Sequence, residues 1–378
     1  MIFVITFTFL IIHTIRLSTL ILTNFKNYEY QSFKFTPGFN LIYGPNGSGK
    51  TNVLDAIHYL ALVKSHFVPQ DRMAIRTGTT FFRLEGIFNK DSKSSKVVLK
   101  FQYKNKKLEF DEQSITRVSD HIGRIGLVMI APDDLEIIDG LSALRRKYMD
   151  ITLVQTNHAY LTNLTLYKKL LDQRNAYLKQ VQTIDPVFLQ VLDEKMESPA
   201  NALFQYRLAF AREFIPYFNK YYHAISGDKE LVDIQYESDL EKNSLLQLLQ
   251  GSLSQDLRTQ YTNKGCHKDD LRFMINGLDV KFVASQGQKK TFLVSLFLAQ
   301  ADYMSHTMTS PPLILLDDVF DKLDPGRMKL LMRTLKTMTD TQIIMTDTNQ
   351  DRIMSIIQDL YIDGNFIDIE NPDFNGIN

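Results

Sequence analysis

Residues 39–63 read FNLIYGPNGSGKTNVLDAIHYLALV, and this stretch decides the fold. Its middle, residues 44–51, has the pattern G-x-x-x-x-G-K-[S/T]. The apolar run at 39–42 predicts a strand before the pattern, and the helical spacing of apolar residues over 52–63 predicts a helix after it. Strand, glycine-rich loop and helix is the context in which this pattern binds phosphate. A glycine-rich turn without a ligand is the alternative, and this context disfavours it.

The loop residues have separate expected roles in binding ATP. Backbone N–H groups converge on phosphate oxygens, and the N-terminus of the following helix favours their negative charge. We expect Lys50 to neutralise the β- and γ-phosphates and the Thr51 hydroxyl to ligate Mg²⁺. The predicted ATP-binding residues of the loop are Gly44, Pro45, Asn46, Gly47, Ser48, Gly49, Lys50 and Thr51.

A second motif, PLILLDD, spans residues 312–318. An apolar run that ends in carboxylates is typical of a buried parallel strand that presents polar groups at its carboxyl edge. We expect Asp317 to hold Mg²⁺, directly or through water, and Asp318 to polarise the attacking water. A solvated acidic turn is the alternative, and the phosphate loop upstream makes it less favoured. The predicted catalytic residues are therefore Lys50, Asp317 and Asp318.

A third segment, SQGQ at residues 285–288, precedes a predicted helix. Taken alone, its serine could be an ordinary helix N-cap. Between the other two motifs, the segment resembles the signature sequence of ABC-type ATPases. In that superfamily the signature opens a helix whose N-terminus contacts the γ-phosphate held by the opposite subunit. The resemblance implies that ATP is also bound by Ser285, Gln286, Gly287 and Gln288.

Within that superfamily the chain resembles the RecF family, over roughly residues 16–360. The motifs occur in the family's order, and SQGQ together with LDDV is the specific combination. They are NFKNY at 24–28, KSH at 64–66, APDDL at 131–135, RR at 145–146, GCHKDD at 265–270, SQGQ at 285–288 and LDDVFDKLD at 316–324.

The resemblance implies an α/β P-loop NTPase of the ABC type, an SMC-like head with an N-terminal β-subdomain and an inserted helical lobe. ATP held between two subunits would drive a homodimer that closes on DNA, and slow hydrolysis would release it. The DNA implied is single- or double-stranded, in particular gapped or junction DNA. The family also implies RecR as a partner, RecO and RecA indirectly, a part in DNA repair and the SOS response, a cytoplasmic location and no membrane partner.

The sequence departs from the family's pattern at several positions. Cys266 stands where proline is usual, and Lys289 replaces a glutamine, so it could bring an extra cation towards phosphate or DNA. We find no glutamine for the Q-loop of ABC-type ATPases. Their switch histidine is also absent, and Thr346 or Asp347 is the expected substitute.

The expected organisation follows the order of the motifs. Residues 1–14 are predicted to be an atypical extension, too short to span a bilayer. Alternating strands at 81–88 and 96–103, joined by the polar run NKDSKSSK, predict a β-subdomain. Helical spacing over 141–225, with a reversal at 184–186, predicts an inserted lobe. The expected units are residues 15–125 for the first half of the core, 126–265 for the lobe and 266–378 for the second half.

The chain has 43 basic and 43 acidic residues, so its formal net charge is zero. A surface that binds DNA is therefore expected to be a local patch of basic residues. Residues 90–107 carry seven basic residues against one acidic residue, and residues 145–179 carry seven against two. Charge runs are often only solvated faces, but phosphate contacts dominate DNA affinity. The second stretch is the better placed, and the predicted DNA contacts are Arg145, Arg146, Lys147, Lys168 and Lys169.

Other interpretations remain open at this stage. An ABC transporter subunit would carry a glutamate after the Mg²⁺ aspartate, and a chromosomal SMC protein would need a far longer insert. His267, Asp269 and Asp270 could suggest a metal site, but no second histidine or cysteine stands at ligand spacing, so a structural role is expected. The single cysteine, Cys266, cannot form an internal disulfide and suits a reducing compartment.

Overall fold

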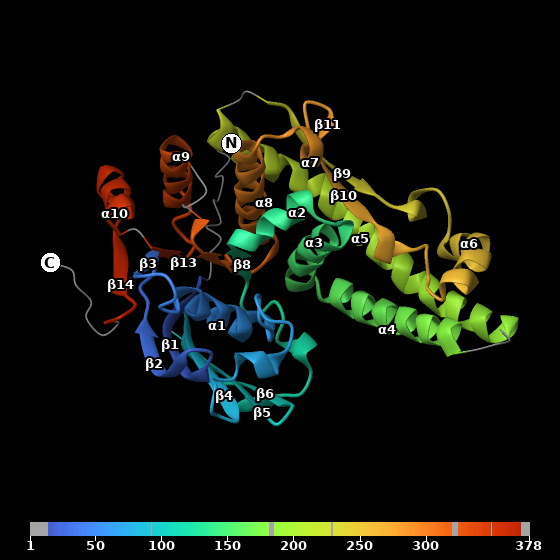
Figure 1. Cartoon of the computed structure of the whole chain (residues 1–378), viewed down its shortest axis with the longest axis horizontal. Coiled ribbons are helices and arrows are strands. Elements are labelled where there is room, and N and C mark those ends of the chain that lie inside the picture. Colours follow the sequence, from blue (N-terminus) through green and yellow to red (C-terminus); the bar gives the residue numbers. More distant parts are fainter. Residues whose placement is uncertain are drawn as a thin grey trace, which may run out of the picture.

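The computed structural model describes residues 14–91, 93–180, 185–227, 230–319, 324–348 and 350–371. These residues form a core around a parallel sheet, an antiparallel sheet beside it and an arm of helices that extends from the core (Figure 1). The α/β class predicted from the sequence is confirmed. Residues 1–13 of the expected extension lie outside the described residues.

A five-stranded parallel sheet forms the centre of the core, in the order β14-β3-β13-β12-β8. Strands from distant parts of the chain are neighbours in it, so the two ends of the sequence build one unit. Its central strands are apolar because both faces of the sheet are covered. The strands are β3 (Phe39–Tyr43), β8 (Leu127–Ile130), β12 (Leu313–Leu316), β13 (Ile343–Asp347) and β14 (Gly364–Asp368).

Successive side chains of the central strands face two different hydrophobic clusters, because side chains alternate across a strand. Leu41 and Leu316 belong to the cluster that includes the arm, whereas Ile42 and Leu315 belong to the cluster that includes the antiparallel sheet. The sheet therefore lies between the two other parts of the molecule. The longer helices of the core are α1 (Lys50–Leu62), α8 (Gln286–Thr307), α9 (Pro325–Lys336) and α10 (Gln350–Asp359).

The expected β-subdomain is a six-stranded antiparallel sheet in the order β2-β1-β4-β5-β6-β7. The predicted loop NKDSKSSK is wrong, because Asn89 pairs with Ser94 and Lys90 with Lys93 in a hairpin. The polar side chains there are mostly exposed, so pairing of the two strands does not bury them. The strands are β1 (Ile15–Phe25), β2 (Tyr28–Lys34), β4 (Phe81–Lys90), β5 (Lys93–Gln102), β6 (Asn105–Phe110) and β7 (Gln113–Ile115).

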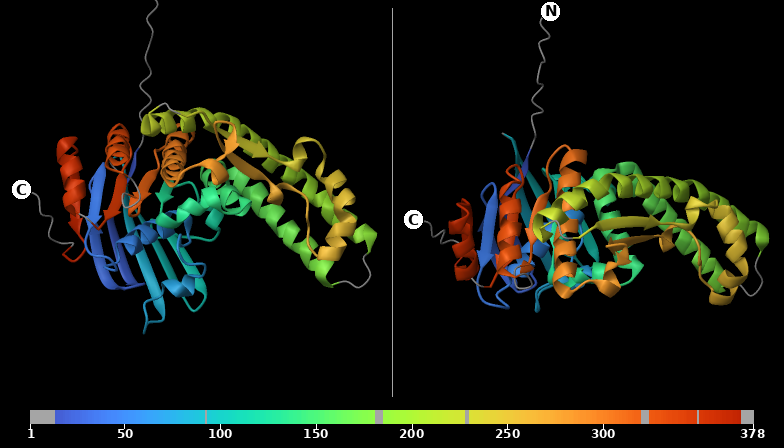
Figure 2. Two further views of the ribbon diagram at one scale, coloured as in Figure 1. Left: turned by 45° about the horizontal axis from the view of Figure 1, so that its top comes forward. Right: turned by 90° about the horizontal axis from the view of Figure 1, so that it is seen from above.

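The arm confirms the helical character predicted for residues 141–225, and both views of Figure 2 show α4 and α5 running together away from the core. Part of the predicted reversal at 184–186 lies outside the described residues, but Asp185 caps the N-terminus of α5. A three-stranded sheet, β11-β10-β9, completes the arm. Its elements are α3 (Ser142–Thr156), α4 (His158–Gln180), α5 (Pro186–Ser226), β9 (Val232–Glu237), α6 (Leu245–Thr259), β10 (Asp270–Ile275) and β11 (Leu278–Asp279).

Both boundaries expected for the lobe need correction. The boundary at residue 126 is too early, because β8 pairs with β12 in the core sheet. The boundary at 265/266 separates β9 from β10, which pair along six residues. Four apolar residues gave too little periodicity to identify β8 as a strand. Short helices mark the junctions: α2 (Glu136–Asp139), α7 (Val280–Val283), η2 (Val118–Asp120), η3 (Pro132–Leu135) and η5 (Cys266–Lys268).

Candidate functional site

The phosphate-loop motif lies between β3 and the N-terminus of α1, as its sequence context predicts. Gly49 caps α1 with a φ of 106°, and Gly47 has a φ of 79°. These values favour glycine, because a side chain is strained in the left-handed region. The fold therefore places the end of a helix, with its free N–H groups, directly after the loop.

The segment NFKNY packs against the loop from outside. A Cβ atom on Gly49 would lie 2.5 Å from Asn27 Nδ2 and 2.7 Å from Tyr28 Oη. Asn27 Nδ2 donates to Ser48 O at 3.2 Å, and its Oδ1 accepts from Asn52 Nδ2 at 2.7 Å. Sequence reasoning used this segment only as a family motif and missed that Asn27 and Asn52 support the loop.

The KSH motif supports the same helix from its other end. Asp55 Oδ2 accepts from Ser65 Oγ and forms an ion pair with Lys26, both at 2.7 Å. Asp55 Oδ1 accepts from the backbone N–H of His66 at 2.8 Å. Two motifs that are distant in sequence therefore meet at one buried carboxylate of α1, which fixes the helix that carries the phosphate loop.

Lys50 is held inside the loop. Its Nζ donates to Gly44 O and Pro45 O, each at 2.9 Å, and only 4% of the residue is exposed. Among the described residues it forms no ion pair with a carboxylate. The ammonium therefore lies beside the N-terminus of α1 without a direct ion pair, in a place where an anion would be stabilised.

Thr51, Asp317 and Thr346 converge on one atom. Asp317 Oδ1 accepts from Thr51 Oγ1 at 3.0 Å and from Thr346 Oγ1 at 2.7 Å. Burial raises the pKa of Asp317, while the two hydroxyls and the charge of Lys50 oppose the rise. A hydroxyl and a carboxylate oxygen in contact suit Mg²⁺, which prefers oxygen ligands and completes its shell with waters and substrate phosphates. The residues present therefore fit the expected cation.

Asp318 lies at the end of β12 with a φ of 44°. Its backbone N–H donates to Thr346 Oγ1 at 3.1 Å, so Thr346 contacts both aspartates. Thr346 and Asp347 are both fully buried, and which of them takes the role of the switch histidine stays a prediction. The catalytic assignment of Asp318 stays a prediction.

The SQGQ segment begins α8 and forms a capping box. Ser285 Oγ accepts from Gln288 N at 3.3 Å, and Gln288 Oε1 accepts from Ser285 N at 2.7 Å. Gln288 Nε2 also donates to Glu230 Oε1 at 2.5 Å. Within the described part of the chain, no hydrogen bond or ion pair links these residues to the phosphate loop. The serine is therefore an N-cap, and the helix end it orders is not engaged by the loop of its own chain.

Lys289 does not extend towards the phosphate loop. Its Nζ forms an ion pair with Asp139 at 2.6 Å and donates to Lys281 O at 3.0 Å. The residue is 8% exposed. The expectation of an extra cation for phosphate or DNA is therefore wrong, because the helical spacing turns position 289 towards α2 and α7.

The predicted DNA contacts lie in different surroundings. Arg145 holds Asp270 through both Nε and Nη2, at 2.8 and 2.9 Å. Arg146 donates to Ser142 Oγ and to Asp269 O, at 2.8 and 2.5 Å. Both arginines therefore connect α3 to its neighbours, and replacing Arg145 would also break an ion pair of the arm.

The three predicted lysine contacts, Lys147, Lys168 and Lys169, are exposed. Lys147 and Lys168 line one cavity together with Arg146, whereas Lys169 does not. In the other basic stretch, Lys96 and Lys106 form ion pairs with Glu85 and Asp71, at 2.5 and 2.8 Å. Both basic stretches therefore keep exposed lysines, and those of the arm differ in that two of them line a cavity.

His267 and its acidic neighbours have structural partners, in line with the role expected for them. His267 Nε2 lies 3.0 Å from Thr262 O, and its Nδ1 lies 2.8 Å from Tyr167 Oη. Burial lowers the pKa of His267 to about 4, so the ring is neutral at pH 7. Asp269 forms an ion pair with Arg207 at 2.7 Å.

Comparison with known proteins identifies relatives over most of the chain. A family model described as RecF/RecN/SMC N terminal domain matches residues 16–362. The DNA replication and repair protein RecF of Phocaeicola vulgatus is 40% identical over 343 residues, which cover 89% of this chain and 91% of that protein. The RecF protein of Bacteroides fragilis is 38% identical over 354 residues, 93% of this chain and 96% of that protein.

Solved structures also resemble this chain. A structure of the recombination mediator protein RecF with ATP, in the RecFOR pathway, has a TM-score of 0.82 at 27% identity and covers 89% of this chain and 93% of that chain. An Smc head bound to the C-winged helix domain of ScpA has a TM-score of 0.54 at 16% identity, over 90% of this chain and 91% of that chain, and shows the fold alone. Of the helices that the structure describes, none combines the length and apolar character needed to cross a bilayer.

Proposed function

The chain belongs to the RecF family of DNA replication and repair proteins, and from that membership we propose that it is an ATPase that closes as a dimer on DNA. The contact that carries the proposal is the meeting of Thr51 and Thr346 on Asp317, beside the loop that holds Lys50. Family membership removes the transporter alternative. The long-insert SMC alternative is disfavoured by the length of the lobe.

Each residue of the site has a proposed role. Lys50 pairs with the β- and γ-phosphates of ATP, while the backbone N–H groups of residues 44–51 hold the remaining oxygens. Thr51 and Asp317 would hold Mg²⁺, which would supply positive charge to the phosphates. Asp318 polarises the attacking water. A carboxylate shorter than glutamate has less reach, so hydrolysis is expected to be slow.

The signature segment is proposed to act on the partner subunit. Residues 285–288 order the N-terminus of α8, and that end makes no polar contact with the loop of its own chain within the described residues. A helix N-terminus stabilises negative charge. The γ-phosphate of ATP bound to one subunit therefore bridges to Ser285 of the other, and hydrolysis removes the bridge and opens the dimer.

The DNA and protein partners are proposed from the family. The solved RecF structures belong to the RecFOR pathway by their description. For this chain we infer binding of gapped or junction DNA with single- and double-stranded parts, cooperation with RecR and RecO in loading RecA, a contribution to the SOS response, and action in the cytoplasm. DNA is expected to stimulate the weak ATPase, because the closed dimer assembles the hydrolytic site.

Gel-filtration mass tests this proposal directly. Wild type and Ser285→Arg are compared with and without ATP and Mg²⁺, and with and without gapped duplex DNA. The expected result is an ATP-dependent dimer that retains DNA in the wild type and is lost in the variant. A monomer under every condition would not contradict ATP binding at the phosphate loop, but it would contradict the role of Ser285 on the partner subunit.

A further inference from the structure

A cavity of about 480 Å³ lies where the arm meets the core. The end of α1 and the η2 segment line one side of it, and α3 and α4 line the other. Figure 1 shows α3 and α4 extending from the core beyond α1. We call this hollow, with its rim residues Lys64, Arg146, Lys147 and Lys168, the basic cavity. Sequence reasoning placed Lys64 in a family motif and did not connect it to the other three.

The rim carries an excess of positive charge. Among the lining residues that the structure describes, Asp150 is the one carboxylate. Asp150 is already engaged by Arg207 at 2.9 Å and by Tyr160 Oη at 2.5 Å, and it lies 3.6 Å from Lys168. In the described part of the chain, Lys64 and Lys147 form no ion pair. Asp150 is shared by Arg207 and Lys168, so the basic residues that line the cavity outnumber its one carboxylate.

The rim cations also disfavour one another. Burial, followed by the charges of Lys147 and Lys168, lowers the pKa of Lys64. Burial and the charge of Arg207 lower the pKa of Arg146. Like charges gathered in a hollow cost free energy unless an anion is bound among them.

The floor of the basic cavity is apolar. Leu62, Ile122, Ile151 and Leu164 line it. A small inorganic anion would gain nothing from such a floor, whereas burying the sugar and base of a nucleotide removes apolar surface from water. A ligand with phosphates at one end and the apolar faces of a base and sugar at the other therefore fits both parts of the cavity.

The basic cavity is separate from the phosphate loop. Lys50 is the first residue of α1, Leu62 is the last, and Lys64 follows it. Thirteen helical residues extend about 20 Å, which is beyond the span of one nucleotide. The ligand of the basic cavity is therefore not the ATP held at residues 44–51, although one rigid helix connects the two places.

We propose that the basic cavity binds a phosphate-bearing nucleotide unit of DNA, with the rim cations on the phosphates and the apolar floor under the sugar or base. This inference rests on the proposed DNA-binding function and assigns that function a place between core and arm. A free nucleotide has the same chemistry, so the experiment separates the two sources.

The test uses two variants that lose equal charge. Lys64→Gln/Lys147→Gln/Lys168→Gln removes three rim cations. Lys195→Gln/Lys242→Gln/Arg258→Gln removes three exposed cations of the arm that do not line the cavity. Both full-length variants are titrated with a fluorescent single-stranded oligothymidylate, at several salt concentrations and with saturating ATP and Mg²⁺. ATP affinity and thermal melting report whether each variant is folded, and Lys168→Gln alone replaces the triple variant if it is not.

The expected result is that the rim variant binds the oligonucleotide at least about tenfold more weakly, with a salt slope smaller by about 1–2, because each lost phosphate contact removes released counterions. The control variant should stay within about twofold of wild type. Equal binding by the rim variant and wild type would show that the basic cavity is not a DNA-binding site, and it would leave the proposed function intact.

A second experiment applies if the proposed DNA-binding function itself is wrong. If the wild type binds no oligonucleotide, DNA binding is wrong, and calorimetry with thymidine bisphosphate decides whether the cavity has a ligand. Binding by the wild type and not by the rim variant would then reassign the cavity to a free nucleotide. If neither protein binds thymidine bisphosphate, the assignment of the basic cavity as a nucleotide-binding site is wrong as well.

Discussion

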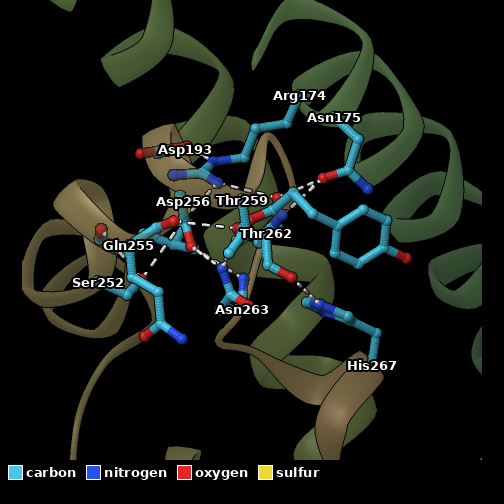
Figure 3. A network of polar contacts seen from close by, with 12 residues as sticks. Arg174, Asn175, Asp193, Ser252, Gln255, Asp256, Thr259, Thr262, Asn263 and His267 are labelled. Carbon is cyan, nitrogen blue, oxygen red and sulfur yellow. Dashed lines mark hydrogen bonds and ion pairs between the residues drawn. The ribbon is translucent and has the colours of Figure 1, made fainter. Parts of the chain in front are cut away.

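The phosphate loop and the far end of the arm each bury a cation, and they satisfy it with different partners. Lys50 donates to two backbone carbonyls, Gly44 O and Pro45 O. Arg174, fully buried, donates to Asp193 Oδ1 and Asp256 Oδ2, each at 2.7 Å, and to Thr262 Oγ1 at 2.9 Å (Figure 3). One cation faces neutral acceptors, and the other faces two carboxylates.

This difference separates a binding site from a structural network. A carbonyl satisfies the hydrogen bond of an ammonium but leaves its charge, which remains available to an anion. Two carboxylates compensate the guanidinium fully, so a further anion would meet a surplus of negative charge. The polar network of the arm extends from Arg174 through Asp256 to Asn263, and it joins α4, α5 and α6 (Figure 3). Four predictions test this division, and they are ordered by expected effect.

Arg174→Leu should lower the free energy of unfolding by about 3–5 kcal/mol, because it leaves two carboxylates buried without their cation. Urea denaturation measures the loss. The triple variant Arg174→Met/Asp193→Leu/Asp256→Asn removes all three charges together, keeps an acceptor for the Asn263 N–H and should recover most of the loss. A loss below about 1 kcal/mol in the single variant would contradict the structural assignment.

Lys50→Ala should reduce the rate of ATP hydrolysis by about 10²–10³-fold, because it removes a preorganised charge from the phosphates. Its free energy of unfolding should change by less than about 1 kcal/mol, since no carboxylate loses an ion pair or a hydrogen bond. Steady-state phosphate release and urea denaturation measure the two quantities, with exposed Lys195→Ala as the control. A variant with the parental rate would show that Lys50 takes no part in catalysis.

The stability of the arm should fall as the pH decreases from about 6.5 to about 4. Burial lowers the pKa of His267 to about 4, so the unfolded chain binds the proton first. The stabilisation is complete above the unfolded pKa and is lost as the pH falls towards the folded value, by at most about 1.4 kcal/mol per pH unit. His58 lies in α1 of the core, and its pKa, lowered to about 3 by burial, gives the core a trend of the same sign. His267→Gln should flatten the trend of the arm, and an unchanged profile of melting temperature against pH would contradict the assignment.

Arg272→Gln should change the free energy of unfolding by less than about 1 kcal/mol. Arg272 pairs with Glu237 at 3.2 Å, but the two side chains are 46% and 53% exposed. Solvent screens such a pair, and holding two flexible side chains costs entropy. A loss as large as that of Arg174→Leu would mean that burial does not divide the arginines of the arm into two classes.

The two regions also differed in how well the sequence predicted them. The phosphate loop, β3, α1 and β12 depend on neighbours within a few residues, and apolar runs beside glycine or aspartate identified them. The support given by Asn27 to Ser48 was missed, because a hydrogen bond across a loop has no periodic pattern. The short strand β8 was missed for a related reason, since only its pairing with β12 distinguishes it from a buried loop.

The networks of the arm could not be predicted from spacing. Arg174 and Asp256 are 82 positions apart, and the packing of α4 against α6 brings them together. In the sequence Arg174 counted as one charge of a basic stretch, although the structure buries it completely. Lys289 gave the same error near the signature segment. Charge alone cannot distinguish a cation with a carboxylate partner from one that is free to bind DNA.

The length of α5 has a mechanical consequence. Its 41 residues extend about 60 Å. Near its C-terminal end Phe218 packs on Phe292 of α8, with ring centroids 4.5 Å apart, and near its N-terminal end Asp193 holds Arg174. Pro199 and Pro216 lie inside the helix, yet α5 is continuous between these two contacts. The helix that Ser285 caps, α8, therefore contacts one end of a helix whose other end lies at the tip of the arm, so a movement of α8 would also displace that tip.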